Sequence, residues 1–320
     1  MKETARATRK RLRVSGVVQG VGFRPHVYNL ARRLGLAGFV LNDGAGVVVE
    51  VEGPEDALAE FVTQLKAAPP PRARIDSIQE EEIAPAAEAS FTINESVPGE
   101  AHTLVSPDLA TCGDCLDELL EPADRRHGYP FTNCTNCGPR FTIIRGVPYD
   151  RPRTTMASFK MCPACQAEYD DPGNRRFHAQ PNACPTCGPA LALWDAAGEA
   201  LATEDAIADA RQFLLDGRVV AVKGLGGYHL ACDATSEAAV AALRARKYRE
   251  DKPFAVMARD VGVVRRYCEM SDDELELLSS EKRPVVLLAK REPFHLPEAI
   301  APRNRYLGVM LPYTPLHHLL

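Results

Sequence analysis

The spacing of the cysteines constrains this chain more than any other feature of its sequence. Eight of the ten cysteines form four Cys-x-x-Cys pairs, and eighteen residues separate the first pair from the second and the third from the fourth. A shift of fifty residues superimposes the first two pairs, and the Gly-Pro that follows them, on the last two. The pairs are Cys112/Cys115, Cys134/Cys137, Cys162/Cys165 and Cys184/Cys187. The sequence therefore contains two tandem copies of one small module.

Each module carries the ligand set of a structural zinc site. Two cysteines separated by two residues can hold one metal from a tight turn, and two such knuckles complete a tetrahedral thiolate site. Four thiolates leave no position for water or substrate, so both metals are interpreted as structural. The alternatives are disulfides, a thioredoxin-like redox pair and an iron–sulfur cluster; spacing, repetition and the absence of a signal-peptide pattern favour zinc. The spacing leaves open whether one metal binds two knuckles of one module or one from each.

Length and charge narrow the functional class. A chain of 320 residues is long for a single core and predicts two or three domains. The net charge is −5, and no segment has the basic surplus of a zinc module that grips a phosphate backbone. No apolar run is long enough to span a bilayer, and residues 1–13 are basic without a hydrophobic region. These features predict a cytoplasmic protein that binds neither membranes nor, as its main partner, nucleic acid.

Residues 8–96 show the element order of a ferredoxin-like sandwich. Periodicity predicts a strand over 11–18, a helix over 24–34, a hairpin of strands over 39–42 and 47–51, a helix after Pro54 and a strand over 73–82. The order βαββαβ is that of ferredoxin-like folds. Residues 91–93 are expected to form a last edge strand before a linker rich in Pro, Gly and Glu.

A glycine-rich turn, GVVQGVGFR over residues 16–24, joins the first strand to the first helix. Three glycines let successive backbone N–H groups and the helix N-terminus point at an anion. Arg24 supplies a guanidinium suited to bidentate contact with phosphoryl oxygens. Asn42, at the end of the next strand, can hold a water in line with the phosphorus. The segment predicted to cradle the phosphate consists of Gln19, Gly20, Val21, Gly22 and Phe23.

This turn and the downstream segment GFVLNDGAGVVVEVEG resemble acylphosphatase. In that family the arginine binds the phosphoryl group and the asparagine positions the attacking water. The resemblance carries those catalytic roles to Arg24 and Asn42. The alternative is a glycine-rich hairpin with a surface arginine and a turn asparagine, which a match over nine consecutive residues disfavours.

Residues 105–195 form the tandem cysteine region. Asp108 is predicted to cap a short helix that leads into the first knuckle. His127 and His178 are not needed as ligands and are expected at the surface or beside a metal site. Four residues are expected in a small core around the metal rather than as a platform for bases: Tyr129, Pro130, Phe131 and Phe141.

Residues 200–320 alternate helices with strands, which indicates an α/β layer domain. Helices are expected over 203–215, over 237–245 and from Ser271, where Glu274 would complete a capping box. Strands are expected over 218–223, 254–257 and 283–288, the first of them buried. Cys232 and Cys268 are assigned to packing rather than to nucleophilic chemistry.

The pattern Lys247-x-Arg249 followed by Lys252-Pro253, downstream of VVAVKGLGGYHLACDAT, resembles YrdC-like domains, which join ATP to a small acid as an acyl-adenylate. The resemblance implies that Lys247, Arg249 and Lys252 contact phosphates and that Lys223 faces the same pocket. A solvated helix end is the alternative for this basic run. The Ser-x-Asn motif of that family is not found before Leu320, so the domain is expected to be truncated at its C-terminus.

In this order, the three regions resemble the N-terminal part of the HypF-type carbamoyltransferases of nickel–iron hydrogenase maturation. The resemblance implies a multidomain fold of α+β and α/β parts, hydrolysis of carbamoyl phosphate and adenylation of the carbamate by ATP with Mg²⁺. It also implies two structural Zn²⁺ ions and a HypE-type maturation protein as the carbamoyl acceptor for cyanide-ligand synthesis. The competing hypotheses are a nucleic-acid-binding zinc protein of the tRNA-modification type and a plain acylphosphatase with structural appendages.

Overall fold

The structure is a computed structural model that describes residues 8–97, 104–248 and 250–320. The chain divides into two compact units. The first combines residues 1–108 with 133–188, and the second combines residues 109–132 with 189–320. The tandem cysteine region is therefore shared between the two units.

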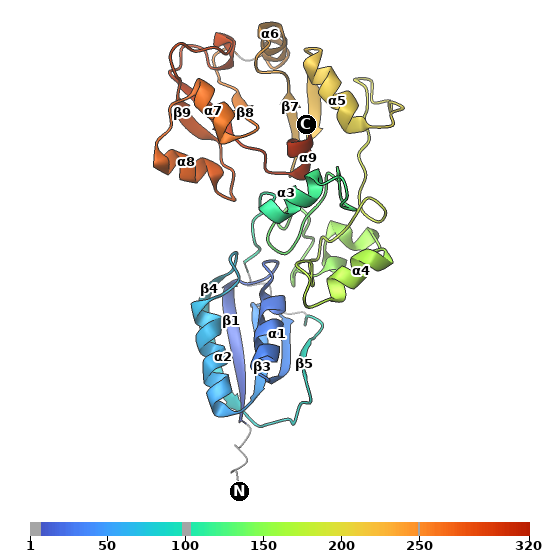
Figure 1. Cartoon of the computed structure of the whole chain (residues 1–320), viewed down its shortest axis with the longest axis vertical. Coiled ribbons are helices and arrows are strands. Elements are labelled where there is room, and N and C mark those ends of the chain that lie inside the picture. The colour runs from blue at the N-terminus through green and yellow to red at the C-terminus, as the bar shows by residue number, and fades with distance from the viewer. Residues whose placement is uncertain (1–7, 98–103, 249) are drawn as a thin grey trace. The chain divides into compact units, whose positions relative to one another are not determined.

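Five strands form one mixed sheet in the first unit (Figure 1). The strand order is β4-β1-β3-β2-β5; β2 and β5 are parallel, and every other neighbouring pair is antiparallel. The elements are β1 (Thr8–Val17), α1 (Phe23–Arg33), β2 (Ala37–Asn42), β3 (Val47–Gly53), α2 (Glu55–Ala67), β4 (Arg74–Ile83) and β5 (Phe91–Ile93). The predicted βαββαβ order and the predicted edge strand are both confirmed.

One face of this sheet shares a hydrophobic core with both helices (Figure 1). Apolar residues recur at every second position in the strands and at three- and four-residue intervals in the helices, as each geometry requires. The most deeply buried members are Leu12, Val49 and Val51 of the sheet, Val27 and Ala31 of α1, and Leu58, Phe61 and Leu65 of α2. Burial of these side chains holds α1 against the sheet, and so fixes the turn between β1 and α1.

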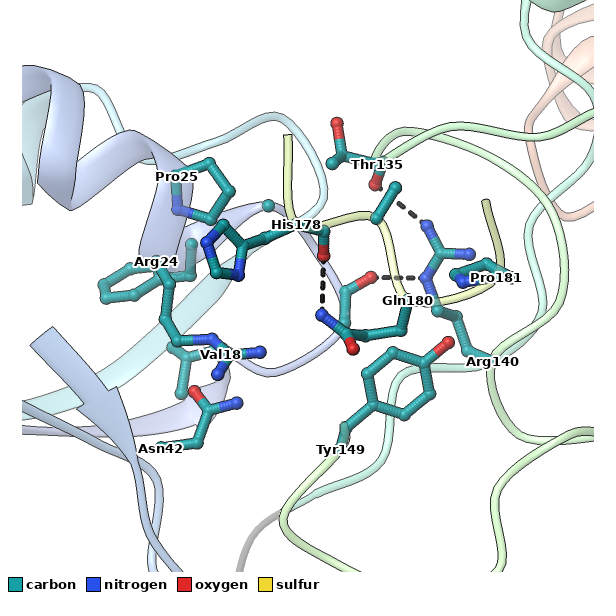
Figure 2. A pocket seen from close by; sticks show the side chains of 14 residues that line it. Val18, Arg24, Pro25, Asn42, Thr135, Arg140, Tyr149, His178, Gln180 and Pro181 are labelled. Atoms are coloured by element: carbon teal, nitrogen blue, oxygen red, sulfur yellow. Dashed lines mark hydrogen bonds between the residues drawn. The ribbon is translucent and has the colours of Figure 1, made fainter. Parts of the chain in front are cut away.

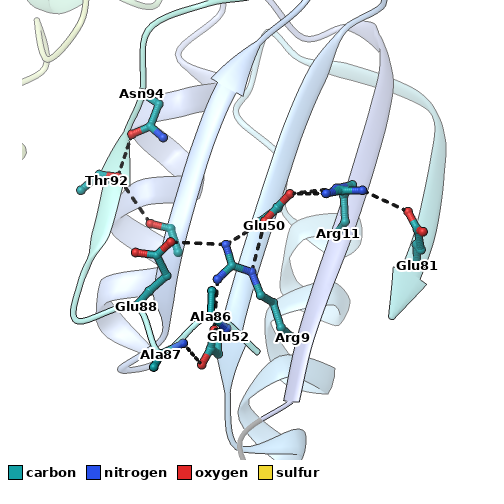
Figure 3. Close-up of polar contacts among 11 residues, drawn as sticks. Arg9, Arg11, Glu50, Glu52, Glu81, Ala86, Ala87, Glu88, Thr92 and Asn94 are labelled. Atoms are coloured by element: carbon teal, nitrogen blue, oxygen red, sulfur yellow. Dashed lines mark hydrogen bonds and ion pairs between the residues drawn. The ribbon is translucent and has the colours of Figure 1, made fainter. Parts of the chain in front are cut away.

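The other face of the sheet carries a network of arginines and glutamates (Figure 3). Arg9 is only 4% exposed and donates to Oε2 of Glu50 at 2.7 Å and to Oε2 of Glu52 at 3.1 Å. Arg11 donates to the other oxygen of Glu50 at 2.8 Å. Burial would raise the pKa of Glu50, but the hydrogen bonds from Arg11 and Arg9 outweigh it and lower the pKa. Charges can line this face because each is paired.

Residues 133–188 pack against α1 with little regular structure. They contain η1 (Arg151–Arg153), η2 (Thr155–Ser158) and α4 (Pro163–Asp170). The rings of Tyr28 and Phe177 lie 5.4 Å apart, and Nδ2 of Asn29 donates to the carbonyl of Pro172 at 3.1 Å. These contacts place the segment beside the turn that precedes α1.

The second unit contains a three-stranded sheet of order β8-β10-β9 and a separate hairpin of β6 and β7. Its elements are α3 (Gly113–Leu120), α5 (Ala206–Leu215), β6 (Val220–Lys223), β7 (Tyr228–Ala231), α6 (Glu237–Arg246), β8 (Ala255–Met257), α7 (Val261–Tyr267), α8 (Asp272–Ser279), β9 (Val286–Ala289), η3 (Glu298–Ile300), β10 (Tyr306–Met310) and α9 (Pro315–Leu319). The predicted α/β alternation is confirmed, as is the capping box of Ser271 and Glu274. None of the helices formed by the described residues combines the length and apolarity of a membrane span.

Three local predictions are wrong. Asp108 caps no helix, because α3 begins only at Gly113; its carboxylate instead accepts from the backbone N–H groups of Arg140 and Thr142. Strand β6 is not buried along its length, since only Val222 lies in the interior. Phe141 is 66% exposed and belongs to no core. Cys268, by contrast, is fully buried in the apolar core of the second unit, as predicted.

Candidate functional site

The turn between β1 and α1 forms one wall of a cavity in the first unit (Figure 2). Gly20 and Gly22 adopt left-handed backbone angles, with φ of 74° and 75°, which side chains disfavour. Gly22 is also the N-cap of α1, and no side chain caps this helix end. Backbone N–H groups at a helix N-terminus form a site for anions. The geometry therefore suits a phosphate cradle.

Arg24 and Asn42 line the same cavity (Figure 2). Arg24 is 8% exposed, and its guanidinium donates to Oδ1 of Asp150 at 2.7 Å and to the hydroxyl of Ser96 at 3.3 Å. Asn42 is 1% exposed, and neither its Nδ2 nor its Oδ1 has a hydrogen-bond partner in the described part of the chain. The two residues singled out from the sequence are thus brought together, although eighteen positions separate them.

The other predicted cradle residues divide into two groups. Gly20, Gly22 and Phe23 line the cavity with Arg24. Gln19 instead holds the loop: its Nε2 donates to the carbonyls of Asp43 and Gly46 at 2.8 and 2.7 Å, and its Oε1 accepts from the N–H of Tyr149 at 2.9 Å. Val21 is fully buried in the apolar core.

The opposite wall of the cavity comes from residues 133–188 (Figure 2). The lining side chains from this segment include Thr135, Arg140, Tyr149, His178 and Gln180. Sequence reasoning did not identify this wall. The sequence did contain one signal for this wall, a difference between the two modules. Arg140 follows the Gly-Pro of the first module, whereas Ala190 follows the Gly-Pro of the second.

Arg140 ties the second knuckle of the first module to the phosphate cradle. It is 1% exposed and donates to the carbonyls of Cys134, Thr135 and Cys137 at 2.9, 2.9 and 3.0 Å. Its Nε donates to the carbonyl of Gly20. A Cβ on Gly20 would lie 3.1 Å from Cδ of Arg140, so a side chain at this position would crowd the arginine. The backbone of the knuckle and the turn before α1 are therefore mechanically linked.

The histidines occupy different environments. His127 is exposed, and a surface position is one of the two that were predicted for it. His178 is mostly buried and lines the cavity. Burial, followed by the charge of Arg24, lowers the pKa of His178 to about 4, while Asp170 and Asp150 act in the opposite direction. The imidazole is therefore neutral near pH 7.

The eight paired cysteines form two clusters of four. In each cluster the four sulfur atoms lie within 4.8 Å of one another, and each cluster takes both knuckles from one module. Individual sulfur pairs lie 3.6 to 3.8 Å apart, far beyond the ~2.05 Å of a disulfide. A tetrahedron with metal–sulfur bonds of ~2.3 Å has an edge of ~3.8 Å. The donor sets fit zinc, and the pairing that the spacing left open lies within each module.

Three of the four predicted nucleotide residues lie at the surface of the second unit. Lys223, Lys247 and Lys252 are exposed, and Nζ of Lys223 lies 4.8 Å from the ring centroid of Tyr228. Arg249 falls outside the described residues. Burial raises the pKa of the half-buried thiol of Cys232, which fits its assignment as a non-nucleophile.

Three family models match the chain. The acylphosphatase model matches residues 10–93, the HypF finger model matches 111–144 and 161–194, and the Sua5/YciO/YrdC model, described as telomere recombination, matches 212–320. The acylphosphatase of Thermotoga maritima is 40% identical over 84 residues, which cover 26% of this chain and 92% of that protein.

The similarity extends beyond single regions. Carbamoyltransferase HypF of Rhodobacter capsulatus is 53% identical over 311 residues, or 97% of this chain and 41% of that protein. A crystal structure described as full-length HypF in the phosphate- and nucleotide-bound form matches 100% of this chain and 42% of its own, with a TM-score of 0.95 and 46% identity. The chain spans about two fifths of the length of the curated relatives that it matches throughout. Because one alignment runs through the sheet, both cysteine modules and the α/β region, the chain belongs to the HypF family of carbamoyltransferases.

Proposed function

We propose that this chain carries out two steps of carbamoyl transfer, the hydrolysis of carbamoyl phosphate and the adenylation of the released carbamate by ATP. Asn42 is the observation that carries the first step. Its carboxamide is buried, has no partner among the described residues and lines the same cavity as Arg24. A buried amide without partners costs free energy, and such a cost persists where a substrate or water satisfies the group during function.

The phosphoryl group would bind at the turn before α1. Backbone N–H groups at the start of the helix and the guanidinium of Arg24 match its charge and its oxygens. Asn42 would hold a water on the side of the phosphorus opposite the carbamate leaving group. The water oxygen and the phosphorus would then be aligned before the attack begins. The water oxygen bonds to phosphorus as the bond to the carbamate oxygen breaks, and phosphate and carbamate are released.

In the second step, the carbamate oxygen would attack the α-phosphorus of ATP and displace pyrophosphate to give carbamoyl-adenylate. We assign Lys223, Lys247, Arg249 and Lys252 to contacts with ATP and carbamate, with Mg²⁺ accompanying the nucleotide. The match to a HypF structure described as phosphate- and nucleotide-bound supports the use of a nucleotide.

We assign one role to each of three regions of the chain. The phosphatase step belongs to residues 8–96, the cysteine region to 105–195 and the adenylation step to 200–320. Each cysteine cluster would hold one structural Zn²⁺, which takes no part in chemistry because thiolates fill all four positions. A HypE-type maturation protein in the cytoplasm would accept the carbamoyl group, on the way to the cyanide ligands of a nickel–iron hydrogenase.

Phosphate release from carbamoyl phosphate by the intact chain tests the first step. Arg24→Ala should lower kcat/KM by about 10³-fold, since it removes the side-chain cation of the cradle. Arg33→Ala is the matched control, because Arg33 is an exposed arginine on the same helix that does not line the cavity. Equal activity of the two variants would refute the assignment.

Pyrophosphate exchange tests the second step separately. With ATP present, exchange should require carbamoyl phosphate and should fall in Lys247→Ala. Hydrolysis of carbamoyl phosphate without any such exchange would leave the chain a phosphatase alone.

A further inference from the structure

The two cysteine modules carry different residues at a left-handed backbone position that they share. Shifted by fifty residues, His178 of the second module coincides with Gly128 of the first. Both residues have positive φ, 53° for His178 and 65° for Gly128. Glycine adopts this conformation freely, whereas a histidine there is strained. The second module therefore keeps a side chain where the same backbone, in the first, has none.

The strained histidine faces the phosphate cradle. Its side chain lines the cavity together with Arg24 and Asn42 (Figure 2). The ring is held by contacts with Tyr169 and Phe177, at centroid distances of 4.9 and 4.7 Å. Its backbone is fixed as well, because its N–H donates to the carbonyl of Tyr169 at 3.0 Å and its own carbonyl accepts from Nε2 of Gln180 at 2.8 Å.

The imidazole has unused hydrogen-bonding capacity. No hydrogen bond among the described residues involves a ring nitrogen of His178, and neither nitrogen is one of the buried polar atoms left without a partner, so both are accessible from the cavity that the residue lines. Arg24, Asp150 and Asp170 are the charged groups that act on the ring, and with burial their balance keeps it neutral. A neutral imidazole presents one N–H donor and one nitrogen acceptor. Backbone strain that places an unpaired, pre-oriented polar group in a cavity is a mark of a functional site.

We propose that His178 recognises the acyl end of the substrate and selects carbamoyl phosphate over acyl phosphates that lack an amino group. The phosphoryl end already has the cation and the backbone N–H groups that it needs. A carbamoyl group has an N–H donor and a carbonyl acceptor, whereas an acetyl group has only the carbonyl. An imidazole acceptor nitrogen would therefore gain a hydrogen bond from carbamoyl phosphate alone. This inference rests on the proposed phosphatase function and states which acyl phosphate the site prefers.

The test compares kcat/KM for carbamoyl phosphate with kcat/KM for acetyl phosphate in the intact chain. His178→Gly installs the residue that the first module uses at this backbone angle, and so removes the imidazole without introducing strain. The ratio of the two values should fall about tenfold, the size of one lost hydrogen bond. The midpoint of thermal unfolding shows whether the variant folds, since the relief of backbone strain opposes the loss of the ring contacts with Tyr169 and Phe177. His127→Gln, in an exposed histidine of the first module, should leave the ratio unchanged.

The outcomes separate the two proposals. If the unaltered chain hydrolyses neither compound, the proposed function itself fails. If it hydrolyses both and His178→Gly leaves the ratio unchanged, or lowers both values equally, the specificity role of His178 is wrong while the function stands. If His178→Gly does not fold, His178→Asn replaces it, since asparagine tolerates left-handed angles; the ratio should again fall, and an unchanged ratio would overturn the inference.

Discussion

Arg24 donates a hydrogen bond to Oδ1 of Asp150 at 2.7 Å, although 126 positions separate the two residues in the sequence. The arginine of the cradle is therefore held by a carboxylate from the cysteine-rich segment. The side chains of both residues are largely buried, at 9% and 22% exposure. The carboxylate orients the guanidinium, but its negative charge also opposes the binding of an anion.

Replacing Asp150 should separate these two effects. In Asp150→Asn, inorganic phosphate should bind about tenfold more tightly, because a negative charge beside the anion is removed. The kcat for carbamoyl phosphate should fall, because Arg24 loses its charged partner. Phosphate-dependent shifts of the unfolding midpoint measure the first effect, with the exposed Asp56→Asn as control. Weaker phosphate binding in Asp150→Asn would contradict this view of the pair.

Asn42 should show a conflict between stability and activity. Asn42→Leu replaces an unsatisfied buried amide with an apolar side chain of similar size, and should stabilise the fold by about 1 kcal/mol. Hydrolysis of carbamoyl phosphate should fall by about 10²-fold or more, because the water is no longer positioned. Chemical denaturation and phosphate release measure the two effects. A variant both less stable and fully active would show that Asn42 is merely structural.

Gly20 and Gly35 form a matched pair of left-handed glycines. Each has positive φ, but a Cβ on Gly20 would meet Arg140 and Tyr149, whereas a Cβ on Gly35 would meet nothing within 4 Å. Gly35→Ala should cost about 1 kcal/mol of unfolding free energy from backbone strain. Gly20→Ala should cost about 2–3 kcal/mol and also lower hydrolysis, because crowding is added to the strain. Equal losses of unfolding free energy in the two variants would mean that the Arg140 side chain moves aside at no cost.

Removing the metals that the two cysteine clusters would hold should impair the proposed hydrolysis of carbamoyl phosphate, although thiolates would fill every position around each metal. Arg140 is bonded both to the backbone of the Cys134/Cys137 knuckle and to Gly20 of the cradle, so loosening of the knuckle disturbs the loop. Chelation should therefore lower the rate of carbamoyl phosphate hydrolysis severalfold. Arg140→Lys should do the same with metal bound, because an ammonium cannot replace the planar fork. Arg145→Lys, in an exposed arginine, is the control. Full activity of the metal-free chain would exclude this coupling.

His178 should contribute to acid sensitivity. Its pKa is lowered from 6.5 to about 4 by burial and then by Arg24, so between these values the unfolded chain binds a proton that the folded chain does not. Stability therefore falls as the pH drops from 6.5 towards 4, by about 2 kcal/mol between pH 7 and pH 5. His178→Gly should lose this part of the pH dependence. Urea unfolding of both chains at the two pH values measures it, and the acid sensitivity of the cysteine clusters cancels in the comparison. Parallel pH profiles would show that His178 is already charged or exposed.

The sequence by itself determined the features that depend on local pattern. The spacing of Cys112 to Cys187 indicated two four-thiolate sites, and the period of apolar residues indicated the ferredoxin-like sheet and its helices. The turn at residues 16–24 and the segment downstream of it, which together resemble acylphosphatase, identified Arg24 and Asn42, and the structure places both in one cavity. Each of these signals lies within a short stretch of chain, where residue type and spacing limit the backbone to few conformations.

Only the tertiary structure decided what surrounds those two residues. Asp150, Arg140 and His178 come from a segment whose pattern reports metal binding. Arg140 and His178 differ from their counterparts in the other module, but that difference does not tell that they adjoin a phosphate cradle. The pairing of knuckles within each module, and the absence of partners around Asn42 within the described ranges, are likewise properties of the folded chain. Long-range packing brings such groups together, and periodicity carries no information about which distant surfaces will meet.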